Sequence, residues 1–340
     1  MDRSHTLHGE MSSSHVEKRQ KSVQDDGLLT PQRDQYTIAW ICALSIEMAA
    51  ARAMLDQFHE PLPITLEDSN TYVLGNIKHH NVVIACLPAE QYGTNNAANV
   101  VTNMKRTFPA IRAGLMVGIG GGAPGKVDVR LGDVVVGTRV MQYDLGKVVE
   151  DGKLQRTAIP RILHQLLGTA VSSLRSKHEL DPSRISFILQ QKLQGHSAYA
   201  RPSTPDRLFK AAYPHAIALA NCDECDPSML QYRGRRISNY ATIHYGAIAS
   251  GNQVMKSGTT RDIVAEQLDV ICFEMEAAGL MDILPCLPIR GICDYSDSHK
   301  TKEWQRYAAA TAAAYARELL EELSVTEGRT RISSGINPRE

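Results

Sequence analysis

The sequence predicts an α/β fold, in which helices cover both faces of a largely parallel central sheet. Apolar, strand-like runs alternate with amphipathic helical patterns throughout residues 35–324, as is typical of this class. Neither an internal repeat nor a Gly/Ser- or Pro-rich linker divides this stretch. We therefore expect one domain over 35–324, flanked by disordered segments at 1–34 and 325–340, whose polar composition cannot offset the entropy of ordering.

The first half of this domain begins with an unbroken apolar run at 36–44, which is typical of a buried strand. Ser45 is a suitable N-cap for the helix that follows, and apolar residues recur there at helical spacing as far as Met54. Glu47 falls in the first turn, where the helix dipole favours a carboxylate. The next expected elements are a hairpin of strands 71–77 and 81–87, a helix at 94–107, and a strand at 115–119 that leads into a glycine-rich turn at 120–122.

The second half continues the alternation. Its expected strands are 133–141, 241–249, a strand ending near Cys272, and 287–293. Its expected helices are 160–174, 204–213, 275–283 and the alanine-rich 304–323. Ligands of open α/β sheets bind at the carboxyl ends of the strands, and three polar clusters fall at such ends: Glu47, residues 274–276, and Asp294.

Charge and composition exclude several classes of function. The chain has 37 Lys and Arg against 37 Asp and Glu, without the basic excess of a nucleic-acid-binding protein. The sequence contains no run of 18 apolar residues that could form a membrane helix, and its N-terminus lacks the apolar stretch of a secretory signal. We therefore expect a cytoplasmic protein with no membrane partner.

The seven cysteines do not suggest a disulfide framework, since most lie in apolar runs and a reducing cytosol disfavours disulfides. Cys222 and Cys225 form the only CxxC pair, which His215 or His244 could complete as a metal site. Zinc sites usually take four ligands and no second CxxC exists, so we expect neither metal nor cofactor and leave this pair open.

Carboxylates mark the places where chemistry is expected. Glu274 and Glu276 stand two residues apart where an apolar strand meets an Ala/Gly-rich helix, and buried carboxylates need partners such as sugar hydroxyls. Asp294 ends an apolar strand, which is where a catalytic group would lie. The glycines at 118–122 would let a ligand approach the backbone, although they match neither a P-loop nor a dinucleotide fingerprint.

These segments together resemble the nucleoside phosphorylase and nucleosidase superfamily, which includes purine nucleoside phosphorylase, uridine phosphorylase and methylthioadenosine/S-adenosylhomocysteine nucleosidase. The Glu-Met-Glu-Ala-Ala stretch from Glu274, the glycine-rich segment, residues 249–252 and the strand from Arg290 to Asp294 occur in the order of that family. Residues 244–254, 290–295 and 297–300 resemble in particular the version of the domain found at the N-terminus of fungal NLR-like proteins. The resemblance implies a phosphorylase/hydrolase-like three-layer α/β/α sandwich with a mixed sheet, and a homo-oligomer.

The resemblance also implies roles for the matching residues. Glu276 would hold the ribose hydroxyls, Asp294 would protonate the leaving base at N7, and Glu47 would orient and deprotonate the attacking water. The further substrate-binding candidates are Gly120, Asn252, Gln253, Val254, Glu274, Met275 and Arg290. Cys293 stands where many relatives carry a serine before the acid, so the sequence leaves the orientation of the Asp294 carboxyl open.

Hydrolysis is favoured over phosphorolysis. Phosphorylases of this family hold phosphate with arginines, one of them just before the glycine-rich segment, whereas residues 115–118 carry no cation and Glu47 would repel an anion. Residues 196–236 form either a solvated surface insertion or a cap whose cations hold a 5′-phosphate chain. The candidates for such phosphate contacts are Arg201, Arg207, Arg233, Lys256 and Lys300.

We therefore expect a purine nucleosidase, acting on an adenine nucleoside or nucleotide with ATP among the candidates. The alternatives are a purine nucleoside phosphorylase and a nucleoside-binding sensor or oligomerising module of an NLR-like system. Retention of Glu276 and Asp294 argues against a catalytically silent module, because a scaffold needs neither.

Overall fold

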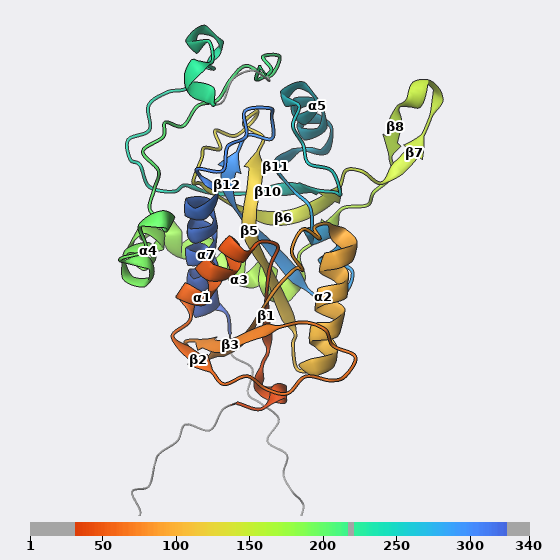
Figure 1. Cartoon of the computed structure of the whole chain (residues 1–340), viewed down its shortest axis with the longest axis vertical. Coiled ribbons are helices and arrows are strands. Elements are labelled where there is room, and N and C mark those ends of the chain that lie inside the picture. The colour runs from red at the N-terminus through yellow and green to blue at the C-terminus, as the bar shows by residue number, and fades with distance from the viewer. Residues whose placement is uncertain (1–30, 217–220, 325–340) are drawn as a thin grey trace, which may run out of the picture. The chain divides into compact units, whose positions relative to one another are not determined.

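A ten-stranded mixed sheet runs through the computed structural model, which describes residues 31–216 and 221–324 (Figure 1). The strands follow the order β11-β10-β6-β12-β5-β1-β4-β3-β2, and β9 pairs with β6. Their bounds are β1 Ile38–Cys42, β2 Gln57–His59, β3 Tyr72–Ile77, β4 His80–Cys86, β5 Ala113–Gly122, β6 Val134–Gln142, β9 Arg161–Ile162, β10 Ile243–Ser250, β11 Val270–Glu274 and β12 Cys286–Asp294. A separate hairpin consists of β7 Gly146–Val148 and β8 Leu154–Arg156.

The sheet combines parallel and antiparallel pairs. Strand β5 lies parallel to both β1 and β12, and β10 lies parallel to both β6 and β11. Antiparallel pairing joins β12 to β6 and the far end of β5 to β11. The last pairing closes β11, β10, β6, β12 and β5 into a ring, so the strands that end near the polar clusters are all tied to one another.

Helices cover both faces of the sheet, which confirms the expected α/β/α layers (Figure 1). One face packs against α1 Ser45–Met54, α3 Gln165–His178, α4 Ile185–Leu193 and α7 Gln305–Glu322, and the other against α2 Thr94–Thr107 and α6 Ala277–Met281. Helix α5 Gly258–Leu268 contacts β11. Along β1, Ile38 and Trp40 face the α1 side and Ala39 and Ile41 the α2 side. Burial on both faces explains why this strand reads as an unbroken apolar run.

Most expected elements are present, although several boundaries differ. Helix α2 spans the predicted residues, and the hairpin turns at Lys78, which has a positive φ of 52°. Ser45 is the first residue of α1 and not its cap, because the Glu47 carboxylate accepts hydrogen bonds from the Ala43 and Leu44 amides before the helix. Of the segments expected to be disordered, 1–30 and 325–340 lie outside the described residues, while Arg33–Gln35 forms a 3₁₀ turn.

Two local predictions are wrong. The segment 204–213 is not helical: its backbone is irregular, and Phe209 forms an isolated bridge with Leu230. The glycines at 120–122 do not turn but continue β5, since Gly121 and Gly122 pair with Phe273 and Cys272 of β11. The 160–174 helix begins later, at Gln165, after the short strand β9. The sequence analysis also missed α4, α5, β2, β7 and β8.

Close packing of α7 on β12 depends on small residues on both elements. The helix buries a run of alanines from Ala308 to Ala316, and Gly291 of β12 lies directly beneath its first turn. A Cβ atom at Gly291 would overlap the carbonyl oxygen of Ala308, which belongs to backbone that cannot turn aside. Among the described helices, including α7, none has both the length and the apolar character needed to cross a bilayer.

We expect Gly291→Ala to lower the free energy of unfolding by about 1–3 kcal/mol, the usual effect of overpacking a tight interior contact. Urea unfolding of the two chains measures the difference. Gly125→Ala is the matched control, because nothing lies within 4 Å of a Cβ built at Gly125. Equal stability of the Gly291 and Gly125 variants would show that α7 can move away from β12 at little cost.

Candidate functional site

A cavity of about 410 Å³ opens where β5, β11 and β12 end and α1 begins. Most of the residues singled out in the sequence line it, although they come from segments up to 250 positions apart. They are Glu47, Gly120, Gln253, Val254, Lys256, Glu274, Met275, Glu276, Arg290, Asp294 and Lys300. Sheet topology thus gathers these residues at one place, as expected for ligands of α/β sheets.

At the base of the cavity, Arg290 holds two carboxylates. Its side chain is 1% exposed, and Nη2 donates hydrogen bonds to Glu274 and, at 3.3 Å, to Oε2 of Glu276. Glu274 also accepts hydrogen bonds from the amides of Glu276 (3.0 Å) and Ala277 (2.9 Å), which fixes the turn between β11 and α6. Glu274 therefore positions the backbone that carries Glu276, in addition to lining the cavity.

Glu276 is an unusual carboxylate because its charged form is disfavoured. Burial raises the pKa of Glu276 to about 7, although the charge of Arg290 opposes the rise; the charges of Glu274 and Glu47 add to it. Both forms of Glu276 are therefore populated near neutral pH. Such perturbed groups in a cavity are typical of sites that bind or transform a ligand.

Glu47 is held at the opening of α1 by three backbone amides. Its Oε2 accepts from Ala43 (2.7 Å) and Leu44 (2.9 Å), and its Oε1 accepts from Ile119 of β5 (2.8 Å). Burial raises the pKa of Glu47, against the opposing effects of Arg290 and these amides. A Cβ at Gly118 would overlap the Glu47 carboxylate and lie 2.8 Å from Nη1 of Arg290. The absence of a side chain at Gly118 therefore lets the acid and the guanidinium approach β5.

Asp294 ends β12 with its carboxyl group already oriented. Oδ1 accepts from the Ser296 amide (2.8 Å) and pairs with Nζ of Lys300 (3.0 Å), and Oδ2 accepts from Sγ of Cys293 (3.1 Å). Cys293 thus contacts the acid directly, as a weak donor. Gly121 leaves room for this arrangement, since a Cβ there would lie 2.7 Å from Oδ1 of Asp294.

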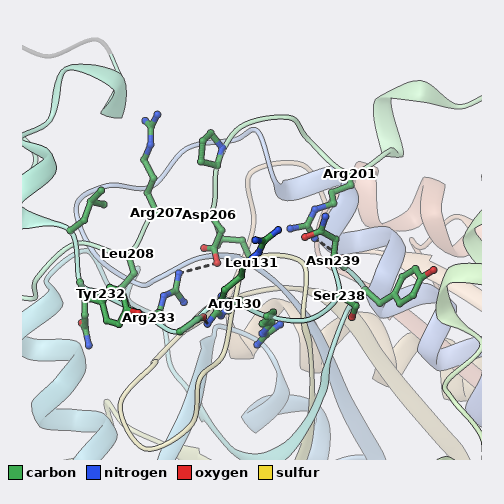
Figure 2. A pocket seen from close by; sticks show the side chains of 17 residues that line it. Arg130, Leu131, Arg201, Asp206, Arg207, Leu208, Tyr232, Arg233, Ser238 and Asn239 are labelled. Carbon is green, nitrogen blue, oxygen red and sulfur yellow. Dashed lines mark hydrogen bonds and ion pairs between the residues drawn. The ribbon is translucent and has the colours of Figure 1, made fainter.

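Four residues that were predicted to contact the ligand do not line this cavity. Asn252 joins two other segments: its Oδ1 accepts from the Thr94 amide (3.0 Å) and its Nδ2 donates to Asp144 (3.0 Å). Arg201, Arg207 and Arg233 line a different cavity, of about 610 Å³ (Figure 2).

Each of those arginines already has a partner. Figure 2 shows Arg233 turned toward Asp206, at 2.9 Å, and Arg207 pairs with Asp223 at 2.7 Å. Arg201 lies over the Trp304 ring, 4.9 Å from its centroid. The possibility that these three arginines cap the cavity lined by Glu47, Glu276 and Asp294 is not met in this structure.

Among the cavity-lining residues that the sequence did not single out are Thr301, Lys302 and Gln305. They lie between the end of β12 and the start of α7, where no motif or periodicity marks a residue as functional. Lys302 adds a cation to Lys256 and Lys300 on the cavity wall.

Metal-binding side chains gather elsewhere. His215, Cys222 and Cys225 place their ligand atoms within 4.8 Å of one another, whereas His244 pairs with Asp133 at 2.8 Å. Of the two histidines that the sequence offered for the CxxC pair, only His215 lies beside it.

We expect Glu276→Gln to raise the melting temperature of the ligand-free chain by a few degrees at about pH 8 and to change it little at about pH 5. The pKa of Glu276 is about 7 in the folded chain and 4.5 at its ordinary value, which applies to the unfolded chain. The stability that protonated Glu276 contributes is therefore fully present below pH 4.5 and is lost as the pH rises through about 7. Thermal unfolding followed by fluorescence at both pH values checks this. Glu60→Gln, at an exposed carboxylate, is the control; a Glu276→Gln chain that melts lower than wild type at the higher pH would contradict the prediction.

Comparisons with known proteins identify the family of the chain. A family model described as the phosphorylase superfamily matches residues 37–323. The chain is 43% identical over 314 residues to a nucleotide-binding leucine-rich repeat (NLR)-like protein of Hyaloscypha variabilis, covering 88% of this chain and 31% of that protein. It is also 25% identical over 297 residues to a 5′-methylthioadenosine/S-adenosylhomocysteine nucleosidase of Mycobacterium bovis, covering 85% of this chain and 97% of that enzyme.

Solved structures share the fold. Futalosine hydrolase of Helicobacter pylori superimposes with a TM-score of 0.57 at 16% identity, over 85% of this chain and 99% of that one. The 5′-methylthioadenosine/S-adenosylhomocysteine nucleosidase of the same organism, in complex with a pyrrolopyrimidine-substituted pyrrolidinol, gives a TM-score of 0.57 at 16% identity over the same shares of the two chains. The chain spans about a third of the NLR-like relative but nearly the whole of the nucleosidases. Because the family model covers most of its length, from β1 through α7, the chain belongs to the phosphorylase superfamily.

Proposed function

We propose that this protein is a nucleosidase that hydrolyses the N-glycosidic bond of a purine nucleoside or nucleotide, with adenine as the base. The observation that carries the proposal is the convergence of Asp294, Glu276 and Glu47 on one cavity, around the buried Arg290. The family and the nucleosidases among its relatives support it.

The arrangement suits glycosidic cleavage, whose transition state resembles an oxocarbenium ion. Glu276 would accept hydrogen bonds from the ribose hydroxyls, and its negative charge would stabilise the positive charge that develops on the sugar. Asp294 would donate a proton to the leaving base, since a purine leaves poorly as an anion. For that step the carboxyl must carry a proton, and Oδ2 is the oxygen that can carry it, because Nζ of Lys300 contacts Oδ1 at 3.0 Å.

Water is the nucleophile that the charges favour. Glu47 and Glu276 flank the base of the cavity together with Glu274, and Arg290 is the guanidinium among its lining residues. A phosphate dianion beside these carboxylates would meet repulsion, whereas a water can donate a hydrogen bond to Glu47 and lose a proton to it.

The cavity wall offers cations for a charged 5′ group. Lys256 and Lys302, with Lys300 beside Asp294, would attract a phosphate chain. We therefore extend the proposal to adenine nucleotides, ATP included, with these lysines in place of the arginines first considered. The same cations are the reason to keep a purine nucleoside phosphorylase as the second candidate, since they could hold inorganic phosphate instead. The homo-oligomer implied by the family resemblance stays a prediction.

We expect free adenine and an unphosphorylated C1 hydroxyl on the sugar when the protein is incubated with adenosine, AMP or ATP in phosphate-free buffer. Chromatography of the products, with and without added phosphate, measures this. Glu47→Gln should slow the reaction, because the attacking water loses its base. Ribose 1-phosphate formed only on addition of phosphate would replace the proposal by the phosphorylase, and binding without turnover of any substrate would favour the sensor module.

We expect Asp294→Asn to lower kcat by about 10²–10⁴-fold while nucleoside binding persists, because the amide keeps the size of the carboxyl but holds no transferable proton. Steady-state kinetics and equilibrium binding to a non-hydrolysable analogue separate the two effects. Asp181→Asn, at an exposed carboxylate between α3 and α4, is the matched control. Near wild-type turnover by the Asp294 variant would exclude Asp294 as the acid.

A further inference from the structure

Three metal-binding side chains converge outside the nucleoside cavity, in the segment between α4 and β10. His215, Cys222 and Cys225 bring one imidazole nitrogen and two sulfurs within 4.8 Å of one another. Cys225 is buried, and the other two are half-buried. A tetrahedral zinc ion holds its ligand atoms about 3.5–4 Å apart, so small side-chain movements would close these three around an ion.

His299 faces the same cluster from the loop that follows β12. Both of its ring nitrogens are buried and make no hydrogen bond within residues 31–216 and 221–324, and Nδ1 has only an ion-pair contact of 3.8 Å with Oδ1 of Asp297, which is unfavourable for an imidazole. Its ring lies edge-on to that of His215, with centroids 5.4 Å apart. Two imidazoles bound to one tetrahedral zinc have centroids about 5 Å apart, given a Zn–N distance of about 2 Å. A metal ion would therefore satisfy the unpartnered imidazole.

The backbone between Cys222 and Cys225 forms a turn that is compatible with metal binding. Cys222 begins the 3₁₀ turn Cys222–Glu224, which the Asn221 side chain caps at the Asp223 amide (2.8 Å). The turn closes with the Cys225 amide donating to the Cys222 carbonyl, at 3.4 Å. A CxxC turn of this kind presents both sulfurs to the same side, as in zinc sites of proteins.

The segment has little regular secondary structure. Between Arg201 and Thr242, the described residues form only two short 3₁₀ turns and the isolated bridge of Phe209 with Leu230. Few backbone hydrogen bonds therefore hold this stretch, and irregular segments without a core of their own are commonly stabilised by a metal.

We propose that His215, Cys222, Cys225 and His299 bind one Zn²⁺ ion as a structural site. Two thiolates and two imidazoles form a donor set that suits zinc better than magnesium or calcium, which prefer oxygen ligands. Four protein ligands leave no open position for substrate, so the ion would support structure and would not take part in glycosidic cleavage.

The site would fasten the irregular segment to the loop that carries the cavity residue Lys300. The irregular segment and this loop already contact each other: the His215 amide donates to Oγ of Ser298 (2.8 Å), and Phe209 stacks on His299 with ring centroids 4.1 Å apart. Lys300, next to His299 in the chain, pairs with Asp294. Zinc would thus restrict the motion of a loop that forms one wall of the nucleoside cavity.

Elemental analysis of the full chain, purified without chelator from zinc-supplemented medium, tests the proposal. We expect about one zinc per chain, lost in Cys222→Ser and His215→Ala and retained in the controls Cys86→Ser and His79→Ala, whose residues lie outside the cluster. His299→Ala should weaken zinc binding at least tenfold in competition with a chromophoric chelator. Unchanged affinity in that variant would overturn the four-ligand assignment.

A second measurement uses the wild-type chain alone, in case the variants do not fold. Cobalt(II) added after removal of zinc should give the intense d–d bands of a tetrahedral ion and the near-ultraviolet band of thiolate-to-cobalt charge transfer. Hydrogen exchange should show that zinc removal exposes amides in residues 205–232 and leaves α3 protected. A chain without zinc, with a Cys222–Cys225 disulfide and no cobalt spectrum, would overturn the proposal. None of these readouts depends on nucleosidase activity, so each can fail or succeed apart from the proposed function.

Discussion

The ion pairs of Arg290 are the interaction on which the rest of the site depends. This residue lies in the middle of β12, is almost completely buried, and contacts Glu274, Glu276 and the Ile119 carbonyl of β5. Removing the guanidinium would leave buried carboxylates without a compensating charge, which typically destabilises a protein by about 3–5 kcal/mol. The arginine therefore both holds the strand ends together and keeps the carboxylates in the cavity.

The same cluster limits what the cavity can bind. Burial is the main cause that raises the pKa of Glu276 to about 7, and the charges of Glu274 and Glu47 add to the rise because one guanidinium does not neutralise three neighbouring acids. A neutral sugar that becomes positively charged during reaction suits such a place, whereas an anion does not. The cations of the site lie instead on lysines around the wall, at Lys256, Lys300 and Lys302. If the proposed function extends to nucleotides, separation of the two signs of charge within one cavity would orient the substrate with its sugar at the base and its phosphates toward the lysines.

Sequence reasoning succeeded where a residue's position follows from the end of a strand. Glu47 and Asp294 were placed together because β1 and β12 were readable as apolar runs and parallel strands end at one edge. Glu276 joins them although β11 is antiparallel to β5, because the far end of β5 pairs with β11. It failed where a side chain's partner is distant in the sequence. Nothing in the local pattern indicates that Arg233 is paired with Asp206, or that His299 lies against His215, 84 positions earlier. The glycines at 120–122 were misread as a turn because their strand partner, β11, is 150 residues away.

Closure of the strand ring has a consequence for how the protein is made. Strand β5 must wait for β12 and β11 to complete its pairing, and these strands are separated from it by more than 140 residues. Contacts of such long range form late and slowly, because the intervening chain must first lose its freedom. On the ribosome, the first half of the domain would emerge with β5 paired to β1 on one edge only and with Glu47 lacking the nearby charge of Arg290. A nascent chain therefore has no competent cavity until residue 294 has left the exit tunnel, so premature termination anywhere before that point gives an inactive product that exposes unpaired strand edges.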